Sequence, residues 1–150
     1  MMGALADSAL AAGGKVIGVI PEHLMRPEVA HQGLTELLVV DSMHTRKRVM
    51  AGRSDAFVVL PGGYGTFEEM FEMVTWRQLE LHAKPVGLVN VDGYFDHLLE
   101  FLRHAAGQEF IRPQHRGLLG VEASVPALLD GLQRQAAAAP PSGGSSLERS

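Results

Sequence analysis

Cysteine is absent from this 150-residue chain, and aromatic residues make up only 6% of it. The absence of cysteine excludes disulfides, thiolate metal sites and a cysteine nucleophile. No apolar run approaches the roughly 20 residues needed to cross a bilayer, and the apolar residues 1–12 lack the basic start of a signal peptide. The formal net charge is −4, so no global basic field attracts nucleic acid. These absences predict a cytoplasmic protein without membrane or nucleic-acid partners, in which any anion site is local.

The residues that are present are typical of one globular domain. Hydrophobic residues make up 46% of the chain and charged residues 20%, and the length suffices to bury a core. From residue 136 onward the composition changes to Ala, Pro, Gly and Ser, which predicts a disordered tail. We therefore predict a single domain over residues 1–135 and a tail over residues 136–150.

Short apolar segments alternate with helical patterns along the predicted domain. Strands are expected at residues 15–20, 35–40, 56–60, 85–91 and 118–121. Helices are expected at residues 4–12, 42–51, 66–82, 94–106 and 125–135. Apolar strands separated by helices indicate an α/β fold, a Rossmann-like parallel sheet with helices on both faces. Binding sites in such folds lie at the carboxyl ends of the strands.

A glycine-rich segment, Pro61-Gly62-Gly63-Tyr64-Gly65-Thr66-Phe67-Glu68-Glu69, follows the strand predicted at 56–60 and opens a helix. Glycines allow a tight turn and the close approach of a ligand to backbone N–H groups, and a helix start attracts anions. Thr66 is placed to cap the helix or to donate its hydroxyl to a phosphate. The spacing from Thr66 to Glu69 also fits a capping box, which only stabilises a helix. This segment alone therefore leaves a purely structural role open.

A basic segment, Met43-His44-Thr45-Arg46-Lys47, follows the strand predicted at 35–40 and also opens a helix. Asp41 or Ser42 is a candidate N-cap for that helix. Arg46 and Lys47 then lie in its early turns, at the same end of the sheet as the glycine-rich segment. A basic pair beside an anion-binding turn suits a phosphorylated ligand. Taken alone, the basic residues 46–48 would be better explained as a solvated helix face.

Together the two segments resemble the LOG family, the cytokinin riboside 5′-monophosphate phosphoribohydrolases, which pair M-H-x-R-K with P-G-G-x-G-T-x-x-E. The similarity covers most of residues 2–132 and continues through Thr75-Trp76, residues 84–90, Gly93-Tyr94-Phe95 and Phe110-Ile111. Members of the family normally carry two further strands, a helix and a glycine-rich loop before the stretch that matches residues 2–7. The resemblance therefore implies a Rossmann-like fold that is N-terminally shortened.

The resemblance implies hydrolysis of the N-glycosidic bond of a cytokinin riboside 5′-monophosphate, with AMP as a further candidate, to free base and ribose 5-phosphate. It places Arg46 and Glu69 as the catalytic pair. The oxocarbenium-like state of such a reaction requires a nearby carboxylate, and the neighbouring Glu68 points about 100° away on a helix. The substrate-binding residues that it implies are Glu28, Arg46, Lys47, Gly62, Gly63, Tyr64, Gly65, Thr66, Phe67, Glu68, Glu69 and Thr75.

The sequence predicts no metal and no cofactor, because its seven histidines form no ligand set. The resemblance implies a homodimer that acts on a small nucleotide. One alternative is a non-catalytic protein of the same fold that binds a nucleotide or a phosphoryl cofactor. Another is an amino-acid decarboxylase, which needs a Schiff-base lysine, and none of Lys15, Lys47 and Lys84 stands out for that role. Release of ribose 5-phosphate from AMP separates a hydrolase from a binding protein.

Overall fold

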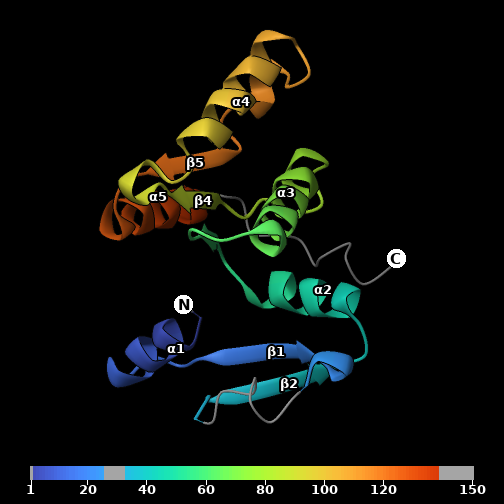
Figure 1. The fold of residues 1–150 in the computed structure, drawn as a ribbon, viewed down its shortest axis with the longest axis vertical. Coiled ribbons are helices and arrows are strands. Elements are labelled where there is room, and N and C mark those ends of the chain that lie inside the picture. Colours follow the sequence, from blue (N-terminus) through green and yellow to red (C-terminus); the bar gives the residue numbers. More distant parts are fainter. Residues whose placement is uncertain (1, 26–32, 139–150) are drawn as a thin grey trace. The chain divides into compact units, whose positions relative to one another are not determined.

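The computed structural model describes residues 2–25 and 33–138. The chain forms two compact units, residues 1–53 and residues 54–150, and in each unit parallel strands alternate with helices (Figure 1). This arrangement is the predicted Rossmann-like α/β fold. Within the described residues no helix is both long enough and apolar enough to cross a membrane.

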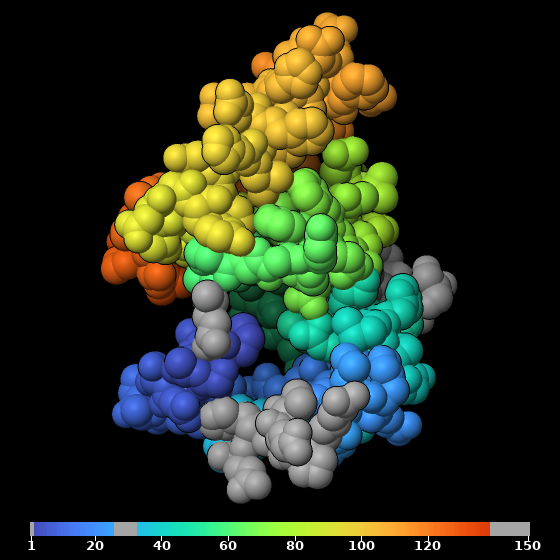
Figure 2. Space-filling model, in the orientation of Figure 1, coloured from blue at the N-terminus to red at the C-terminus, as the bar shows by residue number. Residues whose placement is uncertain are grey.

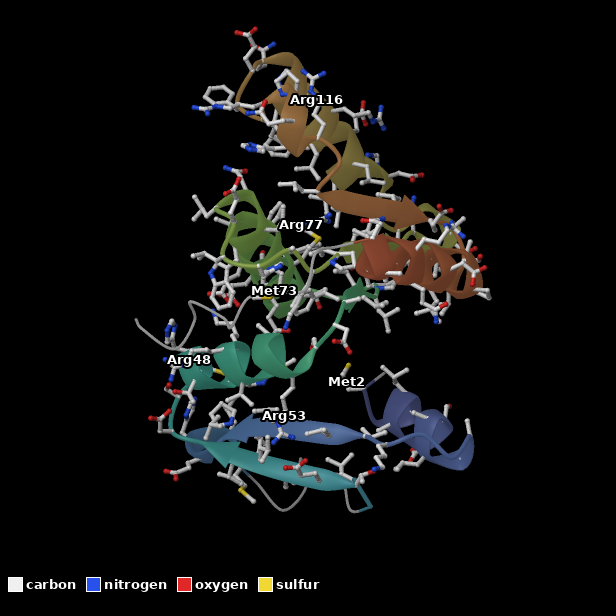
Figure 3. The ribbon with its side chains drawn as sticks, turned by 180° about the vertical axis from the view of Figure 1, so that it is seen from behind. Met2, Arg48, Arg53, Met73, Arg77 and Arg116 are labelled. Atoms are coloured by element: carbon white, nitrogen blue, oxygen red, sulfur yellow. The ribbon has the colours of Figure 1, made fainter. Side chains whose placement is uncertain are left out.

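The first unit is a parallel strand pair with a helix packed on it. Its elements are α1 (Met2–Ala11), β1 (Ile17–Pro21), the 3-10 turn η1 (Glu22–Leu24), β2 (Glu36–Val40) and α2 (Met43–Arg53). Strand β1 pairs with β2 from Ile17–Glu36 to Pro21–Val40. Helix α2 contacts both strands, and its last residue, Arg53, donates to the Glu36 carboxylate at 2.8 Å (Figure 3). Because β1 and β2 are parallel, the carboxyl ends of both strands lie on the side where the chain leaves β2 for α2.

The second unit is a three-stranded parallel sheet in the order β3-β4-β5. Its elements are β3 (Phe57–Val59), α3 (Tyr64–Gln78), β4 (Val86–Val89), η2 (Val91–Gly93), α4 (Asp96–Gly107), η3 (Pro113–His115), β5 (Leu119–Glu122) and α5 (Val125–Ala138). The central strand, β4, is buried along its whole length. Side chains alternate between the faces of a strand, so burial of all four residues means that both faces of β4 are covered.

Helix α5 covers one of these faces. A Cβ atom built on Gly87 would lie 2.6 Å from Leu128 Cδ1, so glycine allows the helix to approach the strand. Val89 lies on the same face and forms a buried cluster with Leu128 and Leu132. Helix α3 contacts β3 and β4 and buries Met70 and Met73.

The predicted elements are all found, with shifted ends. Helix α3 begins at Tyr64 and not at Thr66, and it ends at Gln78 rather than near His82. Helix α5 continues to Ala138, beyond the predicted boundary at 135. The rest of the predicted tail lies outside the described residues. The strands were expected in one sheet but pair in two, one formed by β1 and β2 and the other by β3, β4 and β5.

His82 fastens the end of α3 to the start of β4. Its Nδ1 accepts a hydrogen bond from the Lys84 N–H at 3.1 Å, so Nδ1 carries no proton. Its Nε2 therefore carries the proton and donates to the Met73 carbonyl at 3.0 Å. The ring also packs against Phe57 of β3, with ring centroids 5.4 Å apart. These contacts select the neutral imidazole.

Burial lowers the pKa of His82, and the positive charges of Lys84 and Arg77 lower it further. In the unfolded chain His82 takes up a proton near its ordinary pKa of 6.5, but in the folded chain only at lower pH. His82 therefore stabilises the fold fully above pH 6.5, and this contribution is lost as the pH falls through the folded pKa.

We predict that the free energy of unfolding of the wild type decreases as the pH falls below 6.5, with His82 contributing at most about 1.4 kcal/mol per pH unit. In His82→Gln this part of the pH dependence disappears. The matched control is His104→Gln, because His104 is exposed on α4, and it should keep the wild-type slope. Urea unfolding between pH 7.5 and 5 measures all three. Equal slopes in the wild type and His82→Gln would contradict the assignment.

Candidate functional site

The glycine-rich segment forms the turn between β3 and α3. Gly63 occupies the N-cap position of α3 and has no side chain that could accept the N–H groups of the first turn. The first hydrogen bond of the helix runs from the Phe67 N–H to the Gly63 carbonyl at 3.1 Å. The amides of Tyr64, Gly65 and Thr66 thus start the helix, at the positive end of its dipole.

This turn is accessible to a ligand. Gly63, Tyr64 and Gly65 are all exposed, and the side chain of Tyr64 is 95% exposed. The green segment that starts α3 reaches the surface of its unit (Figure 2). An exposed helix start without a side-chain cap is a ready site for phosphate or carboxylate.

The structural alternative considered for Thr66 and Glu69, a capping box, is wrong. A capping-box threonine stands just before the first helical residue, whereas Thr66 lies within the first turn of α3. The Thr66 side chain instead packs against the Cα atom of Gly62, where an added Cβ would collide with Thr66 Oγ1. Gly62 must therefore lack a side chain, and the Thr66 hydroxyl lies beside the turn.

The two acids of the segment differ in burial. Glu68 is exposed, whereas Glu69 is half-buried. They are successive residues of α3, so their side chains leave the helix about 100° apart. The structure thus gives these neighbours different surroundings, as the helical geometry predicts.

The loop after β4 supports the glycine turn. Tyr94 donates its hydroxyl to the Gly62 carbonyl at 2.8 Å. The ring of Phe95 lies edge-on to Tyr94, with centroids 4.8 Å apart, and edge-on to Phe67 of α3, at 6.2 Å. The carboxyl ends of β3 and β4 are thereby joined at the turn.

The basic segment of the first unit is also placed at the carboxyl end of a strand. Ser42 is the N-cap of α2, since its Oγ accepts the Thr45 N–H at 3.1 Å. Hydrogen bonds from the side chains of Thr45 and Ser42 lower the pKa of Asp41, which keeps this carboxylate ionised. Of the two N-cap candidates, Asp41 and Ser42, it is Ser42 that caps the helix, because its Oγ accepts the Thr45 N–H.

Arg46 is oriented by the backbone of β1. Its Nε donates to the carbonyl of Val19, the middle residue of β1, at 3.1 Å. Arg46 and its neighbour Lys47 are both half-buried. The guanidinium group is therefore held against β1.

The predicted site residues fall into three groups. Arg46 and Lys47 belong to the first unit, and the glycine-rich segment and Thr75, exposed on α3, belong to the second. Glu28 lies outside the described residues. The structure brings together the members of the glycine turn, and the roles of all these residues in binding and catalysis stay predictions.

Two side-chain contacts of the second unit, one at the glycine turn and one at the far end of α3, were not predicted from the sequence. Tyr94 supports the turn from another loop, and Arg77 reaches from α3 to the Leu118 carbonyl beside β5 at 2.8 Å (Figure 3). Burial lowers the pKa of Arg77. The available signal for Tyr94 was the Gly93-Tyr94 pair close behind a buried strand. No pattern in the sequence marks the contact of Arg77.

The family model described as "Possible lysine decarboxylase" matches residues 2–132. A cytokinin riboside 5′-monophosphate phosphoribohydrolase of Rhodococcoides fascians is 54% identical over 117 residues, which are 77% of this chain and 59% of that protein. A "probable" enzyme of the same name from Oryza sativa subsp. japonica is 52% identical over 133 residues, 89% of this chain and 59% of that protein. An Arabidopsis thaliana enzyme of that name is 47% identical over 116 residues, 77% of this chain and 51% of that protein.

This chain thus spans between half and three fifths of the length of these relatives. The match of the family model nevertheless covers nearly all the described residues. The chain therefore belongs to the LOG family, the cytokinin riboside 5′-monophosphate phosphoribohydrolases, whose family model carries the description "Possible lysine decarboxylase".

Proposed function

We propose that this protein hydrolyses the N-glycosidic bond of a cytokinin riboside 5′-monophosphate, and of AMP, to free base and ribose 5-phosphate. The observation that carries the proposal is the start of α3, where exposed backbone amides follow a glycine turn and Gly63 offers no side-chain cap. Such a helix start suits a phosphate group. The names of the relatives are consistent with this substrate class.

In the proposed complex the 5′-phosphate lies on the amides of residues 63–66. Peptide N–H groups that donate to an anion form charge-assisted hydrogen bonds, which are stronger than neutral ones. The Thr66 hydroxyl, beside Gly62, adds a further donor. The phosphate would thereby fix the ribose relative to the acidic residues of α3.

The reaction breaks the bond between C1′ of the ribose and the base nitrogen, and a water oxygen takes the place of the base. Glu69 stabilises the positive charge that develops on the sugar ring and accepts the proton of the attacking water. Arg46 stabilises the negative charge that develops on the base nitrogen as the C1′–N bond breaks. Protonated Glu69 then gives up, by way of solvent water, the proton that it took from the attacking water, and the base nitrogen takes up one proton, so that the base leaves as the neutral purine. Lys47, Thr75 and Glu28 make further contacts with the substrate.

The family resemblance extends the proposal to the assembly and location of the protein. We propose a homodimer in the cytoplasm. Apolar residues on α3 and at its C-cap fit a subunit contact, since Phe71 and the C-cap residue Leu79 are exposed in the single chain. Burial of such side chains is a usual source of dimer stability.

The first test is product analysis with AMP and a cytokinin riboside 5′-monophosphate in the presence of EDTA. We predict release of base and ribose 5-phosphate, with EDTA having no effect. The kcat/KM for the monophosphate should exceed that for the dephosphorylated nucleoside by at least about 100-fold, because the phosphate contacts are charge-assisted.

Two results would contradict this prediction. Equal turnover of nucleoside and monophosphate would mean that the turn does not recognise phosphate. Tight binding of AMP without any product would identify a nucleotide-binding protein instead of a hydrolase.

The second test compares the two neighbouring acids. Glu69→Gln should lower kcat by about 100-fold or more and leave AMP binding nearly unchanged, since a positioned acid–base group contributes on this scale. Glu68→Gln is the matched control and should remain within about tenfold of the wild type, because its side chain points elsewhere. Unchanged turnover in Glu69→Gln, with only a lower melting temperature, would assign Glu69 a structural role.

The third test concerns assembly. Light scattering after size exclusion should give a mass about twice the 16.2 kDa of one chain. Leu79→Asp, which places a charge at the exposed apolar C-cap of α3, should shift the protein toward the monomer. A wild type that is monomeric at all concentrations would contradict the proposed dimer.

A further inference from the structure

We propose that Tyr94 is a positioning residue for phosphate recognition, which it serves by fixing the direction of the peptide group between Gly62 and Gly63. This inference rests on the proposed function. Tyr94 lies in the loop between β4 and α4, outside the glycine-rich segment, and its hydroxyl donates to the Gly62 carbonyl at 2.8 Å.

Because the peptide bond is planar, the hydrogen bond from Tyr94 to the Gly62 carbonyl also fixes the direction of the Gly63 N–H. In a trans peptide the C=O and the N–H point in opposite directions. Holding the Gly62 carbonyl toward Tyr94 therefore directs the Gly63 N–H away from it. This N–H is the first donor of the turn that leads into α3.

Glycine makes the restraint necessary. Neither residue flanking the Gly62–Gly63 peptide has a Cβ atom, so both can adopt backbone conformations that other residues avoid. The peptide group can therefore flip, which exchanges the directions of its C=O and N–H, at a small cost in free energy. Thr66 packs on Gly62, and α3 accepts its first hydrogen bond at the Gly63 carbonyl. Neither contact involves the Gly62 carbonyl, so the Tyr94 hydroxyl adds a separate restraint.

Tyr94 itself is held firmly although it is 53% exposed. The preceding backbone turns through two left-handed residues, Asp92 at φ 49° and Gly93 at φ 71°. The Asn90 side chain accepts the Phe95 N–H at 2.8 Å and donates to the Asp96 carboxylate at 2.7 Å. These hydrogen bonds hold the backbone before and after Tyr94 in place, so the position from which the Tyr94 side chain reaches the glycine turn is fixed.

The buried ring of Phe95 completes the support. Phe95 is 1% exposed and packs edge-on against Tyr94 and against Phe67 in the first turn of α3. Loss of the Tyr94 hydroxyl alone therefore leaves the loop packed and frees only the glycine peptide. This separates the effect on phosphate recognition from a general loss of structure.

The experiment measures the affinities of AMP and adenosine for the full chain by calorimetry. In Tyr94→Phe the dissociation constant of AMP should rise about 2- to 12-fold, the net value of one hydrogen bond, whereas that of adenosine should not change. With AMP as substrate, KM should rise more than kcat falls. The matched control is Thr35→Val, which removes a hydroxyl that accepts the Val16 N–H at 3.0 Å at the amino end of β2, and it should leave both affinities unchanged.

The outcomes separate this inference from the proposed function. A wild type that binds AMP no better than adenosine would overturn both. A wild type that prefers AMP, together with a Tyr94→Phe variant that keeps the full preference or weakens both ligands equally, would overturn only the role of Tyr94.

Discussion

The backbone N–H groups at the start of α3 need hydrogen-bond partners, and the arrangement of the second unit depends on this requirement. The first turn of any helix carries N–H groups that the helix itself cannot satisfy. Most helices use a side-chain oxygen at the N-cap, worth about 1 kcal/mol, but Gly63 cannot supply one. The chain thereby gives up local stability and leaves a row of donors at the surface. Such donors suit an anionic ligand, and the proposed phosphate would account for the glycines of the turn.

The rest of the unit holds that turn in place. Strand β4 is buried on both faces, and Gly87 allows α5 to pack closely against it. From the carboxyl end of β4, Tyr94 and Phe95 reach the glycine turn and the first turn of α3. At the opposite end of α3, His82 joins the helix to the strand that follows. Helix α3 is thus fixed at both ends.

The fold could be predicted from the sequence because short apolar strands alternate along the chain with segments that favour helices. The glycine turn was placed correctly for the same reason, since it directly follows β3. The start of α3 was misplaced because Thr66 and Glu69 have the spacing of a capping box, whereas the chain enters the helix at Tyr64 through Gly63. Tyr94 and His82 could not be assigned roles, because their contacts join segments that are separated in sequence. Such contacts follow from tertiary packing and leave no local periodicity.

The central claim is that the backbone of the α3 start recognises a phosphate. The most direct measurement is an amide NMR titration of the protein with AMP, with adenosine as the reference ligand. The account predicts that AMP shifts the amide resonances of Gly63, Tyr64, Gly65 and Thr66 most strongly, and that adenosine leaves these four nearly unchanged. Equal shifts with both ligands, or AMP-specific shifts confined to other parts of the chain, would contradict it.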